Sequence, residues 1–149
     1  MLITYLDTSA LLKRYVQEPG SEDLQDWLRG FGRVGTTLLT HVEMAAALTK
    51  VERMRWLNSE ETEQAWEDFL LDWNRLAALP ITELIVTRAS YLAWDFGLRG
   101  YDATHLASAL VWKESIDLDV VVGTFDRQLW QAAKQSDLTV WPEDLSVYF

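Results

Sequence analysis

The first fifteen residues constrain the fold of this chain more than any other stretch. Residues 2–6 form an apolar run that is rich in β-branched and aromatic residues and too short for a helix, so they predict a buried strand. Asp7-Thr8-Ser9 is typical of a helix start, and the alanine and leucine residues after it have high helix propensity. The sequence therefore puts a carboxylate between a strand and a helix, where open α/β sheets bind ligands.

The rest of the chain predicts further strands that alternate with helices. The expected strands lie at residues 34–39, 118–123 and 138–140, with a short strand or extended lead-in at 81–86. The expected helices lie at residues 21–30, 40–55, 59–78, 87–98 and 101–112, and after residue 127. Alternating strands and helices predict an α/β domain with a parallel sheet. The consecutive helices 40–55 and 59–78 predict an antiparallel hairpin at the edge of the domain.

Composition limits the classes of protein to consider. With 149 residues, the chain can bury a core of its own, so we expect a single domain over residues 1–149. The absence of cysteine excludes disulfides, zinc–thiolate sites and a cysteine nucleophile. No apolar run reaches the length of a membrane span, and no basic region precedes an apolar core at the N-terminus. We therefore expect a cytoplasmic protein that has no contact with membranes.

The charge balance is strongly acidic. The formal net charge is −10, from 23 aspartates and glutamates against 13 lysines and arginines. A module that binds nucleic acid through electrostatics alone should be basic, so this balance counts against such a module. It does not exclude an enzyme that meets phosphates through bound cations, because several carboxylates would then belong to the metal site. A basic partner chain is the other way to balance the charge.

Four acidic residues occupy comparable places at strand ends and helix starts. Asp7 follows the first strand, Glu43 lies in the first turn of a helix, Asp102 begins a helix and Asp126 follows the strand at 118–123. Each has a structural explanation, such as an N-cap for Asp7 or a favourable helix-dipole contact for Glu43. In a parallel sheet, however, the strand ends share one edge, so these side chains can converge. Converged carboxylates repel each other unless a cation lies among them.

Four segments, in order along the chain, resemble the motifs of the PIN-domain family, and specifically the VapC-type toxin ribonucleases of toxin–antitoxin pairs. They are YLDTSALLKRY at residues 5–15, residues 37–48, LRGYDATHLASA at residues 98–109 and VGTFDRQL at residues 122–129. The third is the most specific match. The resemblance implies an α/β fold with a PIN-like parallel sheet of about five strands, flanked by helices on both faces, and a helical hairpin clip.

The resemblance also implies a reaction and the residues that perform it. The reaction is divalent-metal-dependent cleavage of RNA, in which a metal-activated water attacks a phosphodiester. The catalytic residues and metal ligands would be the four acidic residues Asp7, Glu43, Asp102 and Asp126. Oxygen ligands without cysteine favour Mg²⁺ or Mn²⁺. Three hydroxyl residues would orient these carboxylates and bound water: Thr8, Ser9 and Thr124.

Several residues near the acidic positions have more than one interpretation. Arg14 and Arg127 are candidates for RNA phosphate contacts, although each could equally pair with a carboxylate or remain solvated. For Lys13 and Arg99 we favour pairing or solvation. His105 lies three residues after Asp102 on one helix face, a spacing that suits a ligand or a general base. We favour a structural role, because pairing and packing explain most histidines on helix faces.

The resemblance further implies three partners: an RNA substrate, a second copy of the chain in a homodimer, and a cognate VapB-like antitoxin with a basic segment. Other functions remain open. A PIN-like nuclease could process RNA or cut structured DNA, and a catalytically silent PIN-fold module would only bind partners. All four acidic positions are filled, which argues against the silent module. An aspartate-nucleophile phosphotransferase is less favoured, because no second aspartate lies two residues after Asp7.

Overall fold

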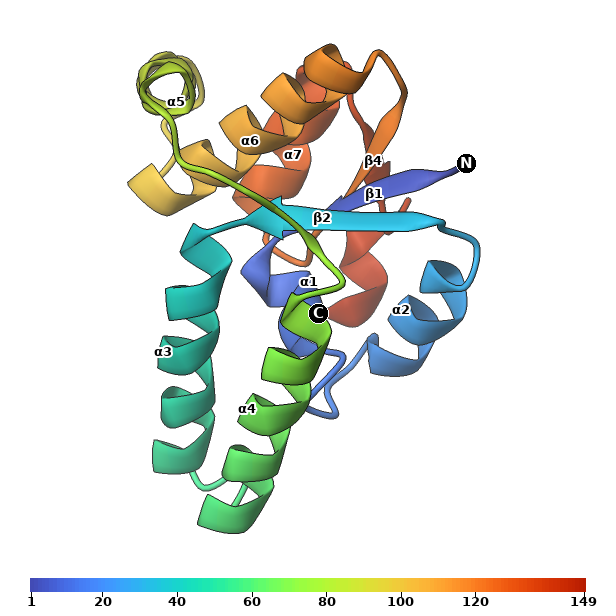
Figure 1. Cartoon of the computed structure of the whole chain (residues 1–149), viewed down its shortest axis with the longest axis vertical. Coiled ribbons are helices and arrows are strands. Elements are labelled where there is room, and N and C mark those ends of the chain that lie inside the picture. The colour runs from blue at the N-terminus through green and yellow to red at the C-terminus, as the bar shows by residue number, and fades with distance from the viewer.

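The computed structural model describes all 149 residues and contains a parallel sheet of five strands (Figure 1). The strands are β1 (Ile3–Leu6), β2 (Arg33–Thr37), β3 (Ala77–Leu79), β4 (Val120–Gly123) and β5 (Thr139–Trp141). Their order across the sheet is β3-β2-β1-β4-β5, and every neighbouring pair is parallel. The expected parallel sheet of about five strands is confirmed.

Helices cover both faces of this sheet, as expected (Figure 1). They are α1 (Thr8–Leu12), α2 (Ser21–Leu28), α3 (Leu39–Arg53), α4 (Ser59–Trp73), α5 (Glu83–Phe96), α6 (Gly100–Ile116) and α7 (Arg127–Gln135), followed by the short 3-10 helix η1 (Leu145–Tyr148). Helices α5, α6 and α7 lie on one side, and α1 to α4 lie on the other. None of the helices combines the length and the apolar character that a membrane crossing requires.

Strand β1 separates two hydrophobic cores. Ile3 and Tyr5 belong to the core that includes residues of α5, α6 and α7, whereas Leu6 belongs to the core with α1 and α2. This division follows from the alternation of side chains along a strand. All four residues of β1 are buried, as in a parallel sheet covered on both faces, and Thr4 satisfies its hydroxyl by donating to the Val121 carbonyl at 2.8 Å.

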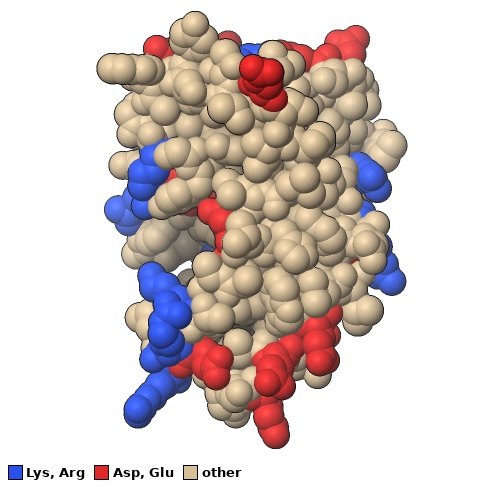
Figure 2. Space-filling view, turned by 60° about the vertical axis from the view of Figure 1, so that its left-hand side comes forward, with Lys and Arg blue, Asp and Glu red and all other residues tan.

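Helices α3 and α4 form the expected antiparallel hairpin, which extends away from the sheet (Figure 1). Asn58 begins α4 with a capping box: its Oδ1 accepts from the Glu61 backbone N–H at 2.9 Å, and the Glu61 carboxylate accepts from the Asn58 N–H at 3.0 Å. Figure 2 shows acidic and basic side chains gathered separately at this end of the molecule, and further basic side chains above a hollow on the same face.

One expected strand was wrong. Residues 81–86 do not form a strand, because Thr82 caps α5 and its Oγ1 accepts from the Ile85 N–H at 3.3 Å. The third strand is instead Ala77–Leu79, whose first two residues fall within the helix expected at 59–78; that helix ends at Trp73. Alanine has high helix propensity, but pairing of these residues with β2 overrides it.

Candidate active site

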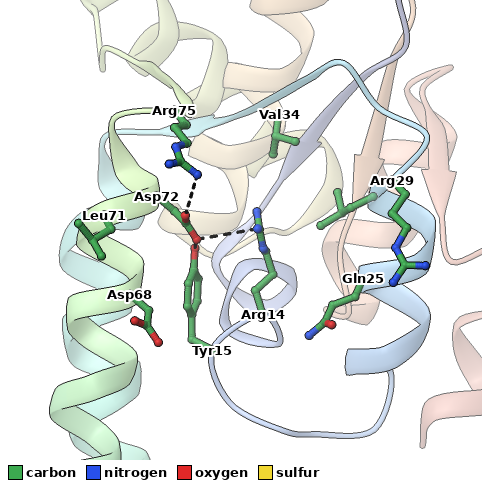
Figure 3. A pocket seen from close by; sticks show the side chains of 10 residues that line it. Arg14, Tyr15, Gln25, Arg29, Val34, Asp68, Leu71, Asp72 and Arg75 are labelled. Carbon is green, nitrogen blue, oxygen red and sulfur yellow. Dashed lines mark hydrogen bonds and ion pairs between the residues drawn. The ribbon is translucent and has the colours of Figure 1, made fainter.

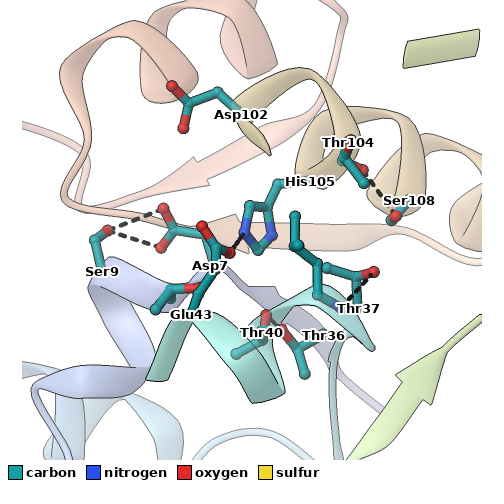
Figure 4. Close-up of polar contacts among 12 residues, drawn as sticks. Asp7, Ser9, Thr36, Thr37, Thr40, Glu43, Asp102, Thr104, His105 and Ser108 are labelled. Atoms are coloured by element: carbon teal, nitrogen blue, oxygen red, sulfur yellow. Dashed lines mark hydrogen bonds and ion pairs between the residues drawn. The ribbon is translucent and has the colours of Figure 1, made fainter. Parts of the chain in front are cut away.

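The carboxyl edge of the sheet holds the segments that carry the acidic residues. Leu6 at the end of β1 is paired with Gly123 at the end of β4, so Asp7 and Thr124 leave the sheet side by side. Helix α3 begins just after β2 and brings Glu43 to the same edge. Figure 4 shows Asp7 and Glu43 close to each other, with Asp102 opposite them on α6.

Asp7 is buried and held on several sides. Its carboxylate accepts from Ser9 Oγ at 2.8 and 2.9 Å, from Thr124 Oγ1 at 2.7 Å and from the Ala10 backbone N–H at 3.0 Å. The bond from Ala10 makes Asp7 the N-cap of α1, so the structural explanation of this residue is correct and coexists with its place at the strand end. Burial raises the pKa of Asp7, while the charge of His105 and the hydrogen bonds oppose that rise.

The hydroxyl groups around Asp7 also connect the segments after β1 and β4. Ser9 Oγ accepts from the Phe125 N–H at 3.0 Å, and Thr124 Oγ1 accepts from the Asp126 N–H at 3.1 Å. Thr8 contacts a different carboxylate, since its hydroxyl donates to Glu43 Oε1 at 2.7 Å. Each of the three hydroxyl residues therefore contacts an acidic residue of this edge.

Glu43 is tied to the core through a buried histidine. His105 Nε2 lies 2.7 Å from Glu43 Oε1 (Figure 4). On the other side of the ring, His105 Nδ1 lies 2.7 Å from the Tyr5 hydroxyl. A carboxylate only accepts, so Nε2 carries the proton in this contact and donates it. Burial disfavours the charged form of Glu43, but the hydrogen bond and charge of His105, together with Thr8, outweigh burial and lower its pKa.

The contact between Tyr5 and His105 was missed by the sequence analysis. We favoured a structural role for His105, and the residue is indeed buried and paired, but its partner is one of the acidic candidates. A signal was available in the strand: Tyr5 lies two residues before Asp7, so the two side chains leave the chain on the same side. Without the packing of α6, that signal does not identify His105 as the partner.

Arg99 bridges the other two acidic residues. Its Nε donates to Asp102 Oδ2 at 3.1 Å, and its Nη2 donates to Asp126 Oδ2 at 3.0 Å. Asp102 is buried, and burial together with the charge of Asp126 raises its pKa to about 6, although Arg99 opposes this shift. Asp126 also accepts from the Leu129 N–H at 2.9 Å and so caps α7.

The two arginines proposed for phosphate contacts, Arg14 and Arg127, contact residues outside the acidic edge of the sheet. Arg14 Nη2 is 3.8 Å from Asp72 Oδ2, and Arg14 lines a cavity of about 700 Å³ together with Tyr15 and Arg75 (Figure 3). Arg127 lies over the ring of Phe149, with its guanidinium carbon 4.3 Å from the centroid. Neither forms a salt bridge with the four acidic candidates, and phosphate binding by them stays a prediction.

The chemistry of this edge fits a hard divalent cation, because its donors are carboxylates and hydroxyl groups without sulfur. No three histidine, aspartate or glutamate side chains are grouped closely enough to hold a metal ion as they stand. Each carboxylate instead accepts hydrogen bonds from other side chains of the protein. The hydroxyls of Ser9 and Thr124 donate to Asp7, and Thr8 and His105 donate to Glu43. Arg99 donates to both Asp102 and Asp126.

The parallel sheet and its acidic carboxyl edge place the chain among α/β proteins whose ligand sites lie at the ends of their strands. The chain belongs to the PIN-domain family, whose model matches residues 4–135. The resemblance inferred from the four sequence segments is therefore confirmed.

Relatives and solved structures of the same fold extend over almost the whole chain. Ribonuclease VapC45 and Ribonuclease VapC49, both from Mycobacterium tuberculosis, are each 33% identical to it over 148 residues, which is 97% of this chain and 99% of the relative. FitAcB from Neisseria gonorrhoeae is 20% identical, with a TM-score of 0.65 over 93% of this chain and 96% of that chain. VapBC-1 from nontypeable Haemophilus influenzae is 19% identical, with a TM-score of 0.62 over 97% and 99% of the two chains.

Proposed function

We propose that this protein is a divalent-metal-dependent endoribonuclease and the toxin of a VapBC-type toxin–antitoxin pair. The observation that carries the proposal is that acidic residues from four separate segments of a PIN domain lie at one edge of its sheet. Relatives named as ribonucleases, at 33% identity over nearly the whole chain, support the same activity.

Asp7, Glu43, Asp102 and Asp126 are the residues that would hold Mg²⁺ or Mn²⁺. A bound cation supplies a water of lowered pKa and stabilises the charge that develops on a phosphodiester. Side chains around the carboxylates keep them in position: Ser9 and Thr124 on Asp7, Thr8 and His105 on Glu43. Oriented ligands of this kind commonly decide metal affinity and activity.

The proposed partners follow from the charge of the chain and from its structural neighbours. A net charge of −10 suits an antitoxin with a basic segment, which would also shield the acidic edge of the sheet. Several neighbouring structures are named as toxin–antitoxin or VapBC complexes, which supports such a partner. A homodimer and a location in the cytoplasm are part of the same proposal.

Metal binding can be tested without knowing the RNA target. The melting temperature of the wild type should rise with the concentration of Mn²⁺ or Mg²⁺, because a ligand that binds only the folded state stabilises it. Asp102→Asn removes a charged ligand at nearly constant shape and should abolish most of that rise. Asp119→Asn is the matched control, since Asp119 is exposed and lies outside the acidic edge, and its response should equal that of the wild type.

The same variants then test the reaction. Cleavage of a mixed cellular RNA should require the metal, stop with a chelator and be lost in Asp102→Asn but not in Asp119→Asn. The absence of any shift in melting temperature at millimolar metal would contradict the proposed mechanism and favour the catalytically silent module. Cleavage of structured DNA or of ribosomal RNA precursors in preference to other RNA would favour a processing nuclease.

A further inference from the structure

Arg99 occupies the place of a counter-cation between two of the proposed metal ligands. Two nitrogens of its guanidinium contact Asp102 Oδ2, each at 3.1 Å, and one of them also contacts Asp126 Oδ2 at 3.0 Å. No other lysine or arginine forms a salt bridge with any of the four acidic candidates. The positive charge at this part of the edge is therefore supplied by the chain itself.

A divalent cation and this guanidinium would be bound by the same two carboxylates. Arg99 donates to Asp102 Oδ2 and to Asp126 Oδ2, and both aspartates are proposed metal ligands. A dication bound by these carboxylates would lie close to the guanidinium, and two positive charges repel each other at such short range. Metal binding at these two residues and the Arg99 bridge therefore exclude each other at least in part.

The position of Arg99 at the surface allows its guanidinium to move away from Asp102 and Asp126. It is the N-cap residue of α6, in extended backbone, and follows the short segment after Gly97, which ends α5 in the left-handed conformation. Its side chain is 54% exposed, so water can solvate the guanidinium once the carboxylates are released. The Tyr101 ring, whose centroid lies 4.7 Å from the guanidinium carbon, offers a contact that does not depend on either aspartate.

We infer that Arg99 is a built-in competitor of the divalent metal, which holds Asp102 and Asp126 together when no metal is bound and is displaced from them when the metal arrives. This inference rests on the proposed metal site. It makes the metal affinity weaker than that of the four carboxylates alone.

The test is a titration of metal binding in Arg99→Gln, which keeps most of the side-chain length but removes the charge. The concentration of Mn²⁺ that gives a fixed rise in melting temperature should fall by about three- to tenfold relative to the wild type, the scale of one or two partly exposed ion pairs. Calorimetric titration with Mn²⁺ should give the same ratio. Arg99→Lys keeps the charge without the planar fork and should lie between the two.

The matched control is Arg88→Gln. Arg88 forms a bidentate salt bridge with Glu114, in which both hydrogen bonds are 2.8 Å long. This pair lies on the surface, outside the acidic edge of the sheet. Its loss should leave the affinity for Mn²⁺ unchanged. Each variant is compared with its own metal-free state, so that a change in folding stability does not enter the ratio.

The outcomes separate the inference from the proposed function. If the wild type binds Mn²⁺ and Arg99→Gln binds it equally well or more weakly, competition by Arg99 is excluded while the metal site stands. If only Arg99→Gln binds at millimolar concentration, competition by Arg99 is supported, while the metal-dependent mechanism proposed for the wild type is contradicted. Absence of binding in both proteins overturns the metal site and, with it, the role of Arg99.

Discussion

His105 connects the acidic edge of the sheet to the interior of the protein. Its ring packs edge-on against Tyr5, with the centroids 5.9 Å apart. One ring nitrogen is hydrogen-bonded to the Tyr5 hydroxyl, and the other is hydrogen-bonded to Glu43. The ring is only 2% exposed, so neither bond can be replaced by water without moving α6. This arrangement holds the Glu43 side chain, which is otherwise partly exposed, in one orientation.

Asp102 contributes to the pH dependence of the stability of the metal-free protein. Its pKa rises from 3.8 to about 6 on folding, so between these values the folded state binds more protons than the unfolded state. Stability from this group is therefore full below pH 4 and is lost as the pH rises through 6. With a chelator present, Asp102→Asn should exceed the wild type in free energy of unfolding by about 1–2 kcal/mol at pH 7.

Urea unfolding of both proteins between pH 4 and pH 7 measures this difference. The gap should close toward pH 4, where Asp102 is protonated in the folded protein. Asp119→Asn should show no such trend. A difference that stays constant over the whole range would mean that Asp102 does not titrate in this window.

At the scale of single elements, β2 depends on a glycine where α6 crosses the sheet. A Cβ at Gly35 would lie 2.4 Å from one atom of the Trp112 ring and 2.5 Å from another, which is closer than real contacts allow. Gly35 is paired with Tyr5 on one side and Ala77 on the other, so the strand cannot shift without disturbing both neighbours. The glycine thus allows the helix that carries Asp102 and His105 to pack closely on the sheet.

Gly35→Ala should lower the free energy of unfolding by about 1–3 kcal/mol, the cost of overpacking a close contact. Gly100→Ala is the matched control: no atom lies within 4 Å of its Cβ position, and alanine suits a helix start at least as well as glycine. Urea unfolding of the three proteins checks the prediction. Equal stability of Gly35→Ala and the wild type would show that Trp112 moves aside freely.

For the molecule as a whole, the net charge of −10 acts against the compact state. Part of the excess lies on α4, where Glu63 and Glu67 are exposed and four residues apart, a spacing at which like charges repel. Raising NaCl from about 20 to about 300 mM shortens the screening length from roughly 20 Å to roughly 6 Å. The melting temperature of the metal-free protein should therefore rise with salt.

The double variant Glu63→Gln, Glu67→Gln reduces the repulsion and should show a smaller rise over the same range. Differential scanning calorimetry in the presence of a chelator measures both. A melting temperature that falls with salt would mean that attractive pairs, such as those of Arg99 and Arg88, outweigh the general repulsion.

Much of this fold and part of its site were predictable from local sequence. Strand β1, the helix start at Asp7 and the hairpin of α3 and α4 each depend on residues close together in the chain. Strand β3 could not be found in this way, because its three residues resemble the end of a helix and become a strand only by pairing with β2. The helix expected at 87–98 begins earlier, at Glu83, where Thr82 caps α5. The residues before this cap show no clear hydrophobic periodicity, so the sequence pattern did not locate the start of the helix.

The sequence by itself determined which segments carry carboxylates and that each lies near a strand end or a helix start, since these are properties of neighbouring residues; Glu43 lies one turn further into its helix than the first turn expected for it. Only the tertiary structure decided their partners. His105 lies 100 residues from Tyr5 and 62 from Glu43, and Arg99 lies 27 residues from Asp126. Such contacts depend on how the helices pack across the sheet. A local sequence pattern does not predict whether an arginine or histidine pairs with a given carboxylate or remains solvated.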